Sequence, residues 1–154
     1  MNIFRIHQDA AISAAMLMTH DPKRGRKQLL EGCQIIASAE RLHRGDTTML
    51  KANGIPYGLT HPHHPCVTHC ATSLLQRAIL VNTTAALALC NPGHACSVSF
   101  FAWRMHFESR LACLDIAHYA VVVRKNHEHV YVDTVDKYAA LMLAYLRDTK
   151  GFPA

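Results

Sequence analysis

Residues 23–31 combine a cluster of positive charge with one carboxylate, the residue types needed to bind an anion and move a proton. The members are Lys23, Arg24, Arg26, Lys27 and Glu31. Cations at the start of a helix suit a phosphate or pyrophosphate group, because the positive helix end and its free N–H groups add to the side-chain charge. Glu31 would then stand beside the bound anion as a general base, or would orient an amine.

The same residues also fit an ordinary solvated helix face. At 100° per residue, one arc of the helix carries Arg24, Lys27, Gln28 and Glu31. The opposite arc carries the apolar residues Leu29, Leu30, Cys33, Ile36 and Ala37. In this interpretation Lys27 and Glu31 form a surface ion pair worth roughly 0.2–0.5 kcal/mol. Periodicity alone favours the solvated face.

A second cluster gathers potential metal ligands in the ten positions from 61 to 70. They are His61, His63, His64, Cys66, His69 and Cys70, and Cys90, His94 and Cys96 follow further along the chain. The spacing lacks the paired Cys-x₂-Cys units of a structural zinc site, and the prolines favour a rigid, non-helical loop at the edge of a cleft. The sequence therefore favours unligated thiols over Zn²⁺, establishes no cofactor, and leaves assistance by Mg²⁺ open.

Caps and periodicity place both clusters on elements of a helical protein. Asp9 can cap a helix over residues 10–19, and Asp21-Pro22 suits the start of a second helix that runs to about residue 43 and stops at Gly45. A loop is expected from 45 to 65. Further helices are expected over residues 73–90, 100–118 and 135–148, and a short β-hairpin over 119–123 and 130–132. The sequence predicts a mainly α, compact single-domain helical bundle over 1–154, with room for one short β-hairpin.

Composition narrows the class of protein. The chain has 154 residues, of which 50% are hydrophobic, enough to bury a core and too many for a disordered tail. The net charge of +5 and a pI near 9.0 suggest an anionic partner. The first residues lack the apolar core of a secretory signal, and polar residues interrupt the longest apolar stretch, 74–90. We therefore expect a cytoplasmic protein without a membrane partner, whose cysteines are thiols.

Several segments resemble a family of small phage proteins. Its members begin Met-Asn-Ile-Phe, continue with the helix pattern Asp-Lys-x-Val-Val-Lys-Met-x-Leu-Glu-x-Ala-Gln, and carry a Thr-His-x-x-His-Pro loop. The matching segments here are 1–5, 23–34 and 60–65, with a weaker match at 133–138. On these segments the chain is similar to the phage α-glutamyl/putrescinyl thymine pyrophosphorylases, or amino acid:DNA transferases, and distantly to phage pyrimidine-dimer DNA glycosylases.

The resemblance implies a step in thymine hypermodification. A 5-hydroxymethyluracil in DNA is first activated as a pyrophosphate ester, and the transferase replaces the pyrophosphate with the amine of an amino acid or polyamine. Lys23, Arg24 and Lys27 would neutralise the leaving group, with either Glu31 or His64 taking the proton of the amine. The other expected pocket residues are Asn2, Arg5, His61 and Tyr138. The target base would leave the stack, and the reaction would occur in the host cytoplasm if the chain is phage-encoded.

Two other functions fit the same residues. One is a DNA glycosylase for modified or damaged pyrimidines, in which an amine forms a Schiff base at C1′ of the sugar. The other is a zinc-stabilised nucleic-acid-binding module without catalysis. The sequence leaves the donor amine and the oligomeric state open.

Overall fold

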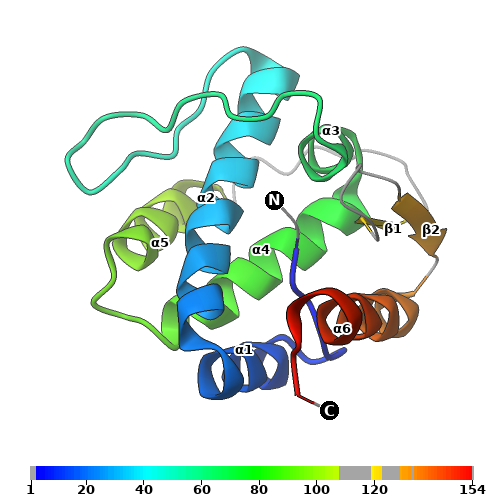
Figure 1. Ribbon diagram of the computed structural model, residues 1–154. Helices are drawn as coiled ribbons and strands as arrows, with labels where there is room; N and C mark the ends of the chain where they lie inside the picture. Colours follow the sequence, from blue (N-terminus) through cyan, green and yellow to red (C-terminus); the bar gives the residue numbers. More distant parts are fainter. Residues whose placement is uncertain (1–2, 108–118, 123–128, 133, 154) are drawn as a thin grey trace.

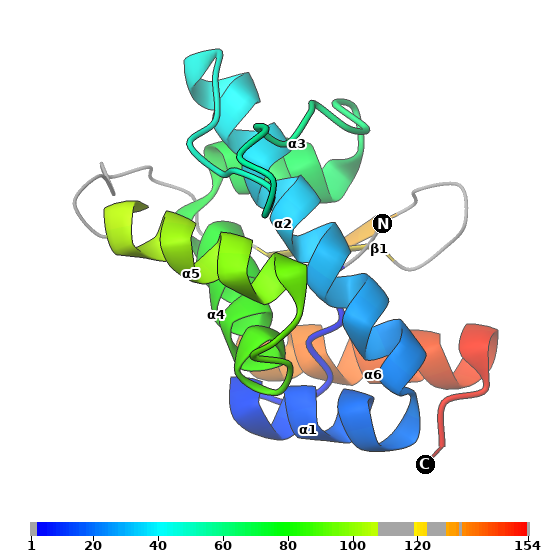
Figure 2. The same cartoon turned by 90° about the vertical axis from the view of Figure 1, so that its left-hand side faces the viewer.

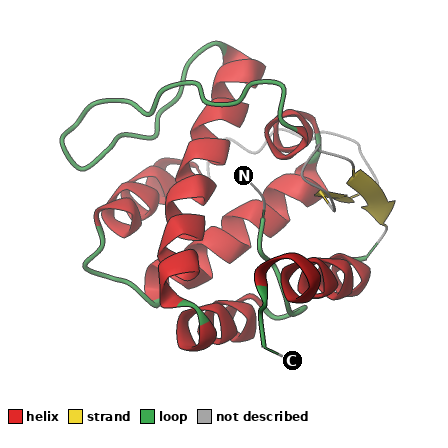
Figure 3. Cartoon of the chain, in the orientation of Figure 1, coloured by secondary structure: helices red, strands yellow, loops and turns green. Residues whose placement is uncertain are grey.

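Six helices and one β-hairpin make up the described part of the chain, which in this computed structural model comprises residues 3–107, 119–122, 129–132 and 134–153 (Figures 1 and 3). The helices are α1 (Ala10–His20), α2 (Pro22–Arg44), α3 (Pro65–Thr72), α4 (Leu74–Leu89), α5 (Ala95–Phe107) and α6 (Val135–Lys150). The strands β1 (Tyr119–Val122) and β2 (His129–Val132) pair antiparallel. The mainly helical fold and the short hairpin are confirmed. None of the described helices is long and apolar enough to cross a membrane.

Local sequence explains where α1 and α2 begin and where α2 ends. The Asp9 carboxylate accepts hydrogen bonds from the N–H groups of the first turn of α1. The Asp21 carboxylate does the same for α2, and Pro22 follows at a position where a missing N–H costs little. Gly45 ends α2 with φ at 86°, in the left-handed region where a glycine has no Cβ penalty. These boundaries agree with the sequence-based expectation.

The helix α3 was not expected from the sequence. The loop was expected to run from 45 to 65 and the next helix to begin near 73, but the chain is already helical from Pro65. The ring Nδ1 of His64 accepts a hydrogen bond from the Cys66 N–H at 3.1 Å, so His64 caps the helix and Pro65 occupies its first position. The proline that indicated a rigid loop instead begins a helix. In addition, α5 begins at Ala95 rather than at Phe100, and its expected continuation over 108–118 lies outside the described residues.

The core lies where α2 and α4 cross. α4 contacts α1, α2, α3 and α5, while α1 and α6 lie at the end of the molecule where α2 begins (Figures 1 and 2). The core includes Phe100 and Trp103, both from α5. A Cβ at Gly32 would stand 2.4 Å from Thr84 Oγ1, so the glycine permits the close approach of α2 and α4.

Residues 45–64 form a loop that projects from the end of α2 (Figure 1). Leu50 and Pro56 form an isolated antiparallel bridge within it. Tyr57, in contrast to the exposed neighbours Ile55 and Pro56, is buried. Its carbonyl oxygen accepts a hydrogen bond from Arg41 Nε at 3.0 Å. The loop is therefore anchored to α2 through Tyr57.

Candidate functional site

The polar face of α2 lines a surface pocket with a volume of about 380 Å³, which we call the α2 pocket. Its walls come from the N-terminal segment, the first turns of α2, and α6. The lining residues are Phe4, Asp21, Lys23, Arg24, Lys27, Glu31, Tyr145 and Lys150. The cations outnumber the carboxylates, so the pocket favours an anionic ligand. The structure thus brings together the predicted residues Lys23, Arg24, Lys27 and Glu31.

The α2 pocket pairs an exposed cation with a carboxylate that is largely shielded from solvent. Lys27 Nζ lies 3.8 Å from Glu31 Oε1, and the two side chains are 71% and 15% exposed. Gln28, on the same arc, is buried, and its Oε1 accepts a hydrogen bond from the Phe4 N–H at 3.2 Å. The N-terminal segment therefore covers this arc. The interpretation of an ordinary solvated face is wrong for Gln28, which is buried, whereas the Lys27–Glu31 ion pair that it predicted is present.

Two of the first positions of α2 have no free N–H group for an anion. Asp21 Oδ1 accepts a hydrogen bond from the Arg24 N–H at 2.9 Å, and Pro22 has no N–H to offer. The expectation that free N–H groups of α2 would bind the anion is therefore wrong for these two positions. Asp21 Oδ2 also lies 2.6 Å from Arg24 Nη1 and orients that guanidinium. Arg26 is exposed and is not among the described residues that line the pocket.

Arg5 and Tyr138, both expected to contact substrate, instead bind the protein itself. The Arg5 guanidinium is buried and donates to the carbonyl oxygens of His7, at 2.8 Å, and Gln8. The Tyr138 hydroxyl donates to the carbonyl oxygen of Ile3 at 2.8 Å, and burial raises the pKa of this phenol well above its usual value. Neither residue lines the α2 pocket within the described part of the chain. Both hold the N-terminal segment in place. The predicted residue Asn2 lies outside the described residues.

The structure does not bring His64 or His61 to Glu31. Both line a separate hollow of about 320 Å³, together with Pro62 and His63. His64 is buried and its ring caps α3, while His61 has a positive φ of 47° in the loop before it. Of the two candidate bases, only Glu31 stands among the cations of the α2 pocket.

The potential metal ligands of residues 61–70 do not converge on a common centre. Cys66 and Cys70 face the core, and burial raises the pKa of Cys66 to about 12. His69 Nδ1 lies 2.8 Å from the carbonyl oxygen of Pro65. Within the described ranges, no three side chains of His, Cys, Asp or Glu are grouped so as to hold a metal ion. The expected zinc alternative finds no support in these residues.

Sequence reasoning missed four residues of the pocket. Phe4 and Asp21 were within reach, because Phe4 belongs to a matching segment and Asp21 was recognised as a cap. Tyr145 and Lys150 come from α6, more than a hundred residues away, and no local pattern connects them with α2. Phe4 and Tyr145 give the charged pocket two aromatic walls.

Comparisons with family models, with curated proteins and with solved structures found no match to this chain. The functional assignment therefore depends on the geometry of the α2 pocket and on the resemblance of the segments that form it. Two of those segments, 1–5 and 23–34, contribute lining residues to the pocket, namely Phe4 and the α2 residues from Lys23 to Glu31. These two matching segments are therefore neighbours in space, whereas the matching segment 60–65 lines the separate hollow around His61 and His64.

Proposed function

We propose that the protein is an amino acid (or amine):DNA transferase, which displaces pyrophosphate from activated 5-hydroxymethyluracil in DNA with the amine of an amino acid or polyamine. The observation that carries this proposal is the α2 pocket, whose lining combines four cations with the shielded carboxylate of Glu31 and with Asp21, the ion-pair partner of Arg24. A departing pyrophosphate gains negative charge as its C–O bond breaks, and cations already in place stabilise that charge.

The size and walls of the pocket suit a base extruded from DNA. Its volume of about 380 Å³ lies within the range of small-molecule sites. Enzymes that act on a base take it out of the stack and commonly hold it against aromatic side chains. Phe4 and Tyr145 supply aromatic side chains to the lining of this pocket.

The proposed reaction uses each residue at a stated atom. The donor amine must lose a proton, which Glu31 accepts at its carboxylate. The amine nitrogen attacks the methylene carbon of the activated base, the C–O bond breaks, and pyrophosphate leaves with the electron pair. Lys23, Lys27 and Arg24, the last oriented by Asp21, neutralise the leaving group.

The test uses an oligonucleotide carrying the pyrophosphate ester of 5-hydroxymethyluracil, incubated with the protein and a pool of amino acids and polyamines. Mass spectrometry of the digested nucleosides should show an amine adduct, with release of pyrophosphate. Lys27→Ala and Arg24→Ala should each lower kcat/KM by roughly 2–4 kcal/mol of transition-state stabilisation. Their effect on binding of unmodified duplex should be much smaller.

Arg26→Ala is the matched control, because it removes an exposed cation from the same turn of α2 without changing the pocket lining. It should leave the transfer rate nearly unchanged. Equal losses for Arg26→Ala and Lys27→Ala, on activated and unmodified DNA alike, would reduce the cluster to a general DNA-binding patch. Absence of any adduct would refute the proposed activity.

A DNA glycosylase is the second candidate, and one observation favours it. An amine, Lys27 Nζ, stands 3.8 Å from a carboxylate, Glu31, as needed to form and resolve a Schiff base with an opened sugar. Borohydride would trap such an intermediate as a stable protein–DNA adduct. Trapping on damaged DNA, without amine transfer to the activated base, would favour this candidate over the transferase.

A further inference from the structure

A second pocket, of about 630 Å³, lies between α2, α5 and the projecting loop. Tyr57, Ala95 and Ser99 belong to its lining. Ser99 is 4% exposed. Within the described part of the chain its buried hydroxyl makes no hydrogen bond. It lies near the Tyr57 hydroxyl and lowers the pKa of that phenol slightly against the larger effect of burial. A buried hydroxyl without a partner is costly, and this one lies behind the wall of the pocket, near Tyr57.

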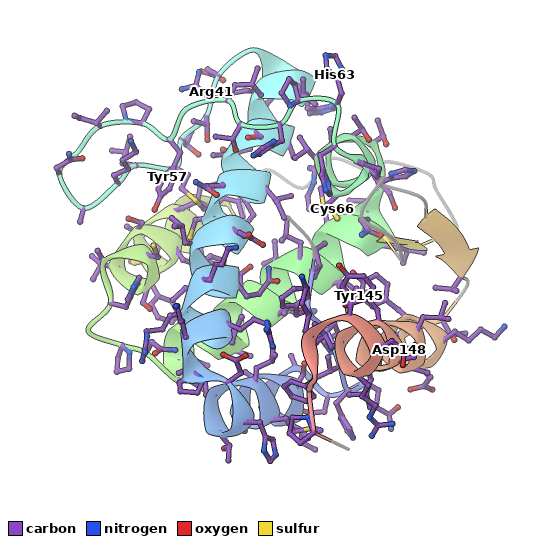
Figure 4. All side chains as sticks on the ribbon, in the orientation of Figure 1. Arg41, Tyr57, His63, Cys66, Tyr145 and Asp148 are labelled. Atoms are coloured by element: carbon purple, nitrogen blue, oxygen red, sulfur yellow. The ribbon has the colours of Figure 1, made fainter. Side chains whose placement is uncertain are left out.

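Cys96 lies between Ala95 and Ser99 in sequence, behind this wall. It is 6% exposed and is not itself among the described residues that line the pocket. It occupies the second position of α5, and its N–H donates to Nδ1 of His94, the residue before the helix, at 3.2 Å. The Tyr57 hydroxyl donates to Cys96 Sγ at 3.7 Å. A helix N-terminus and a hydroxyl donor are both features that stabilise a thiolate. Figure 4 shows Tyr57 close to sulfur atoms where α5 passes α2.

Cys33, on α2, completes the cluster from the other side. It is fully buried, and its Sγ lies 3.6 Å from the carbonyl oxygen of Cys96. A hydrogen bond from the Cys33 thiol is the largest cause that lowers the pKa of Cys96, to about 6, and the same bond raises the pKa of Cys33. Two thiols from different helices are thus neighbours, one poised to attack and one kept protonated.

We propose that Cys96 and Cys33 form a reversible thiol–disulfide site that reacts with small organic disulfides entering the second pocket. The Cys96 thiolate attacks one sulfur of the reagent, whose S–S bond breaks, and the first thiolate leaves with the electron pair. Cys33 then loses its proton and attacks the Cys96 sulfur of the mixed disulfide, releasing the second thiolate. Two protein thiols are oxidised, and one reagent disulfide is reduced to two thiols.

This site is independent of the proposed transferase chemistry, because it involves a different pocket on a neighbouring face of α2. The other described cysteines serve as internal comparisons. Cys90 is exposed, whereas Cys66 and Cys70 are buried in the core with raised pKa values. Exposure alone would make Cys90 react first, and the geometry described above makes Cys96 react first.

The experiment treats the whole protein with bis(2-hydroxyethyl) disulfide at pH 7, with acid quenching at intervals and peptide mass spectrometry. Cys96 should be modified several-fold faster than Cys90, and the mixed disulfide should convert into a Cys33–Cys96 cross-link. In Cys33→Ser the reaction should stop at the mixed disulfide on Cys96. Tyr57→Phe should slow the first step several-fold, while Cys90→Ser should leave the cross-link unchanged.

A titration of the initial rate should have its midpoint near pH 6 for Cys96 rather than near the ordinary thiol value of 9.0. The far-UV circular dichroism of each variant shows whether it is folded, and the wild-type result stands without the variants. Modification of Cys90 ahead of Cys96, or a wild-type protein that yields no 33–96 cross-link, would overturn the proposal.

Discussion

Replacement of Glu31 by glutamine separates the proposed chemistry from simple stabilisation of α2. Glu31→Gln preserves the shape of the side chain and removes its basicity. The ion pair that it breaks joins Glu31 to Lys27 over 3.8 Å, and Lys27 is 71% exposed. Such a pair contributes at most about 0.5 kcal/mol to the free energy of unfolding. We therefore expect almost unchanged stability and a fall in kcat of roughly 10²–10⁴, the contribution of a positioned general base.

The assay measures kcat for amine transfer against pH, alongside urea denaturation of wild type and Glu31→Gln. Raising the pH should partly restore the mutant, because more of the donor amine is then already deprotonated. Full activity of Glu31→Gln across the pH range would refute the assignment of Glu31 as the base. An equal loss of activity at every pH would instead assign it a role in positioning.

Glu40, on the same helix, is the matched structural control. It is buried, and its carboxylate accepts hydrogen bonds from Trp103 Nε1 at 2.9 Å, Arg44 Nη2 at 3.0 Å and the Thr48 N–H at 3.1 Å. Because its partners are donors, Glu40→Gln turns an amide N–H toward another donor and should cost about 2–3 kcal/mol of stability. Its effect should appear in the denaturation curve, and the pH profile of transfer by the folded variant should stay that of wild type.

Three further predictions concern packing, DNA binding and the thiol pair. Gly32→Ala should lower the free energy of unfolding by roughly 1–3 kcal/mol, since the new Cβ would meet Thr84 Oγ1 at 2.4 Å. Gly25→Ala should cost less in the same urea titration, because its one close contact is the Met18 Sδ, at 2.5 Å, on a flexible side chain. A plot of the logarithm of the DNA-binding constant against the logarithm of the salt concentration should have a slope of roughly −4 to −5 for about four to six phosphate contacts. Lys27→Ala should reduce the magnitude of this slope by about 1. Binding that does not depend on salt would exclude DNA as the ligand. Between pH 6 and pH 9.0 the Cys96 thiol binds fewer protons in the folded than in the unfolded protein, so the free energy of unfolding should rise with pH over that window. Denaturation curves at pH 6 and pH 8 should show this rise in the wild type and not in Cys96→Ser.

The helix boundaries that the sequence predicted correctly are those with local signals. Asp9, the Asp21-Pro22 pair and Gly45 act through hydrogen bonds and dihedral angles within one turn, so their effect needs no knowledge of the tertiary fold. α3 lacks such a common signal, because its cap is an imidazole, that of His64. A histidine followed by a proline looks like part of a loop until the ring nitrogen is seen to accept the helix N–H.

The candidate site was predictable only where one helix carries it. Helical spacing placed Arg24, Lys27 and Glu31 on one arc, and all three line the α2 pocket. Spacing could not show that other chain segments cover the arc, which decides whether it is a solvated face or a pocket wall. For the same reason Tyr138 was assigned to substrate: a polar residue in a matching segment can face a ligand or the protein, and only burial distinguishes the two.

The buried polar residues outside the pocket act on it through the N-terminal segment. Gln28 of α2 accepts a hydrogen bond from the Phe4 N–H, and Tyr138 of α6 donates to the neighbouring carbonyl oxygen of Ile3. Because the two helices that supply the charged wall also hold this segment, the aromatic wall formed by Phe4 is fixed relative to Glu31. Cations and aromatic faces held in this way need little reorganisation when charge develops on a leaving group, which is the condition for strong electrostatic stabilisation of a transition state.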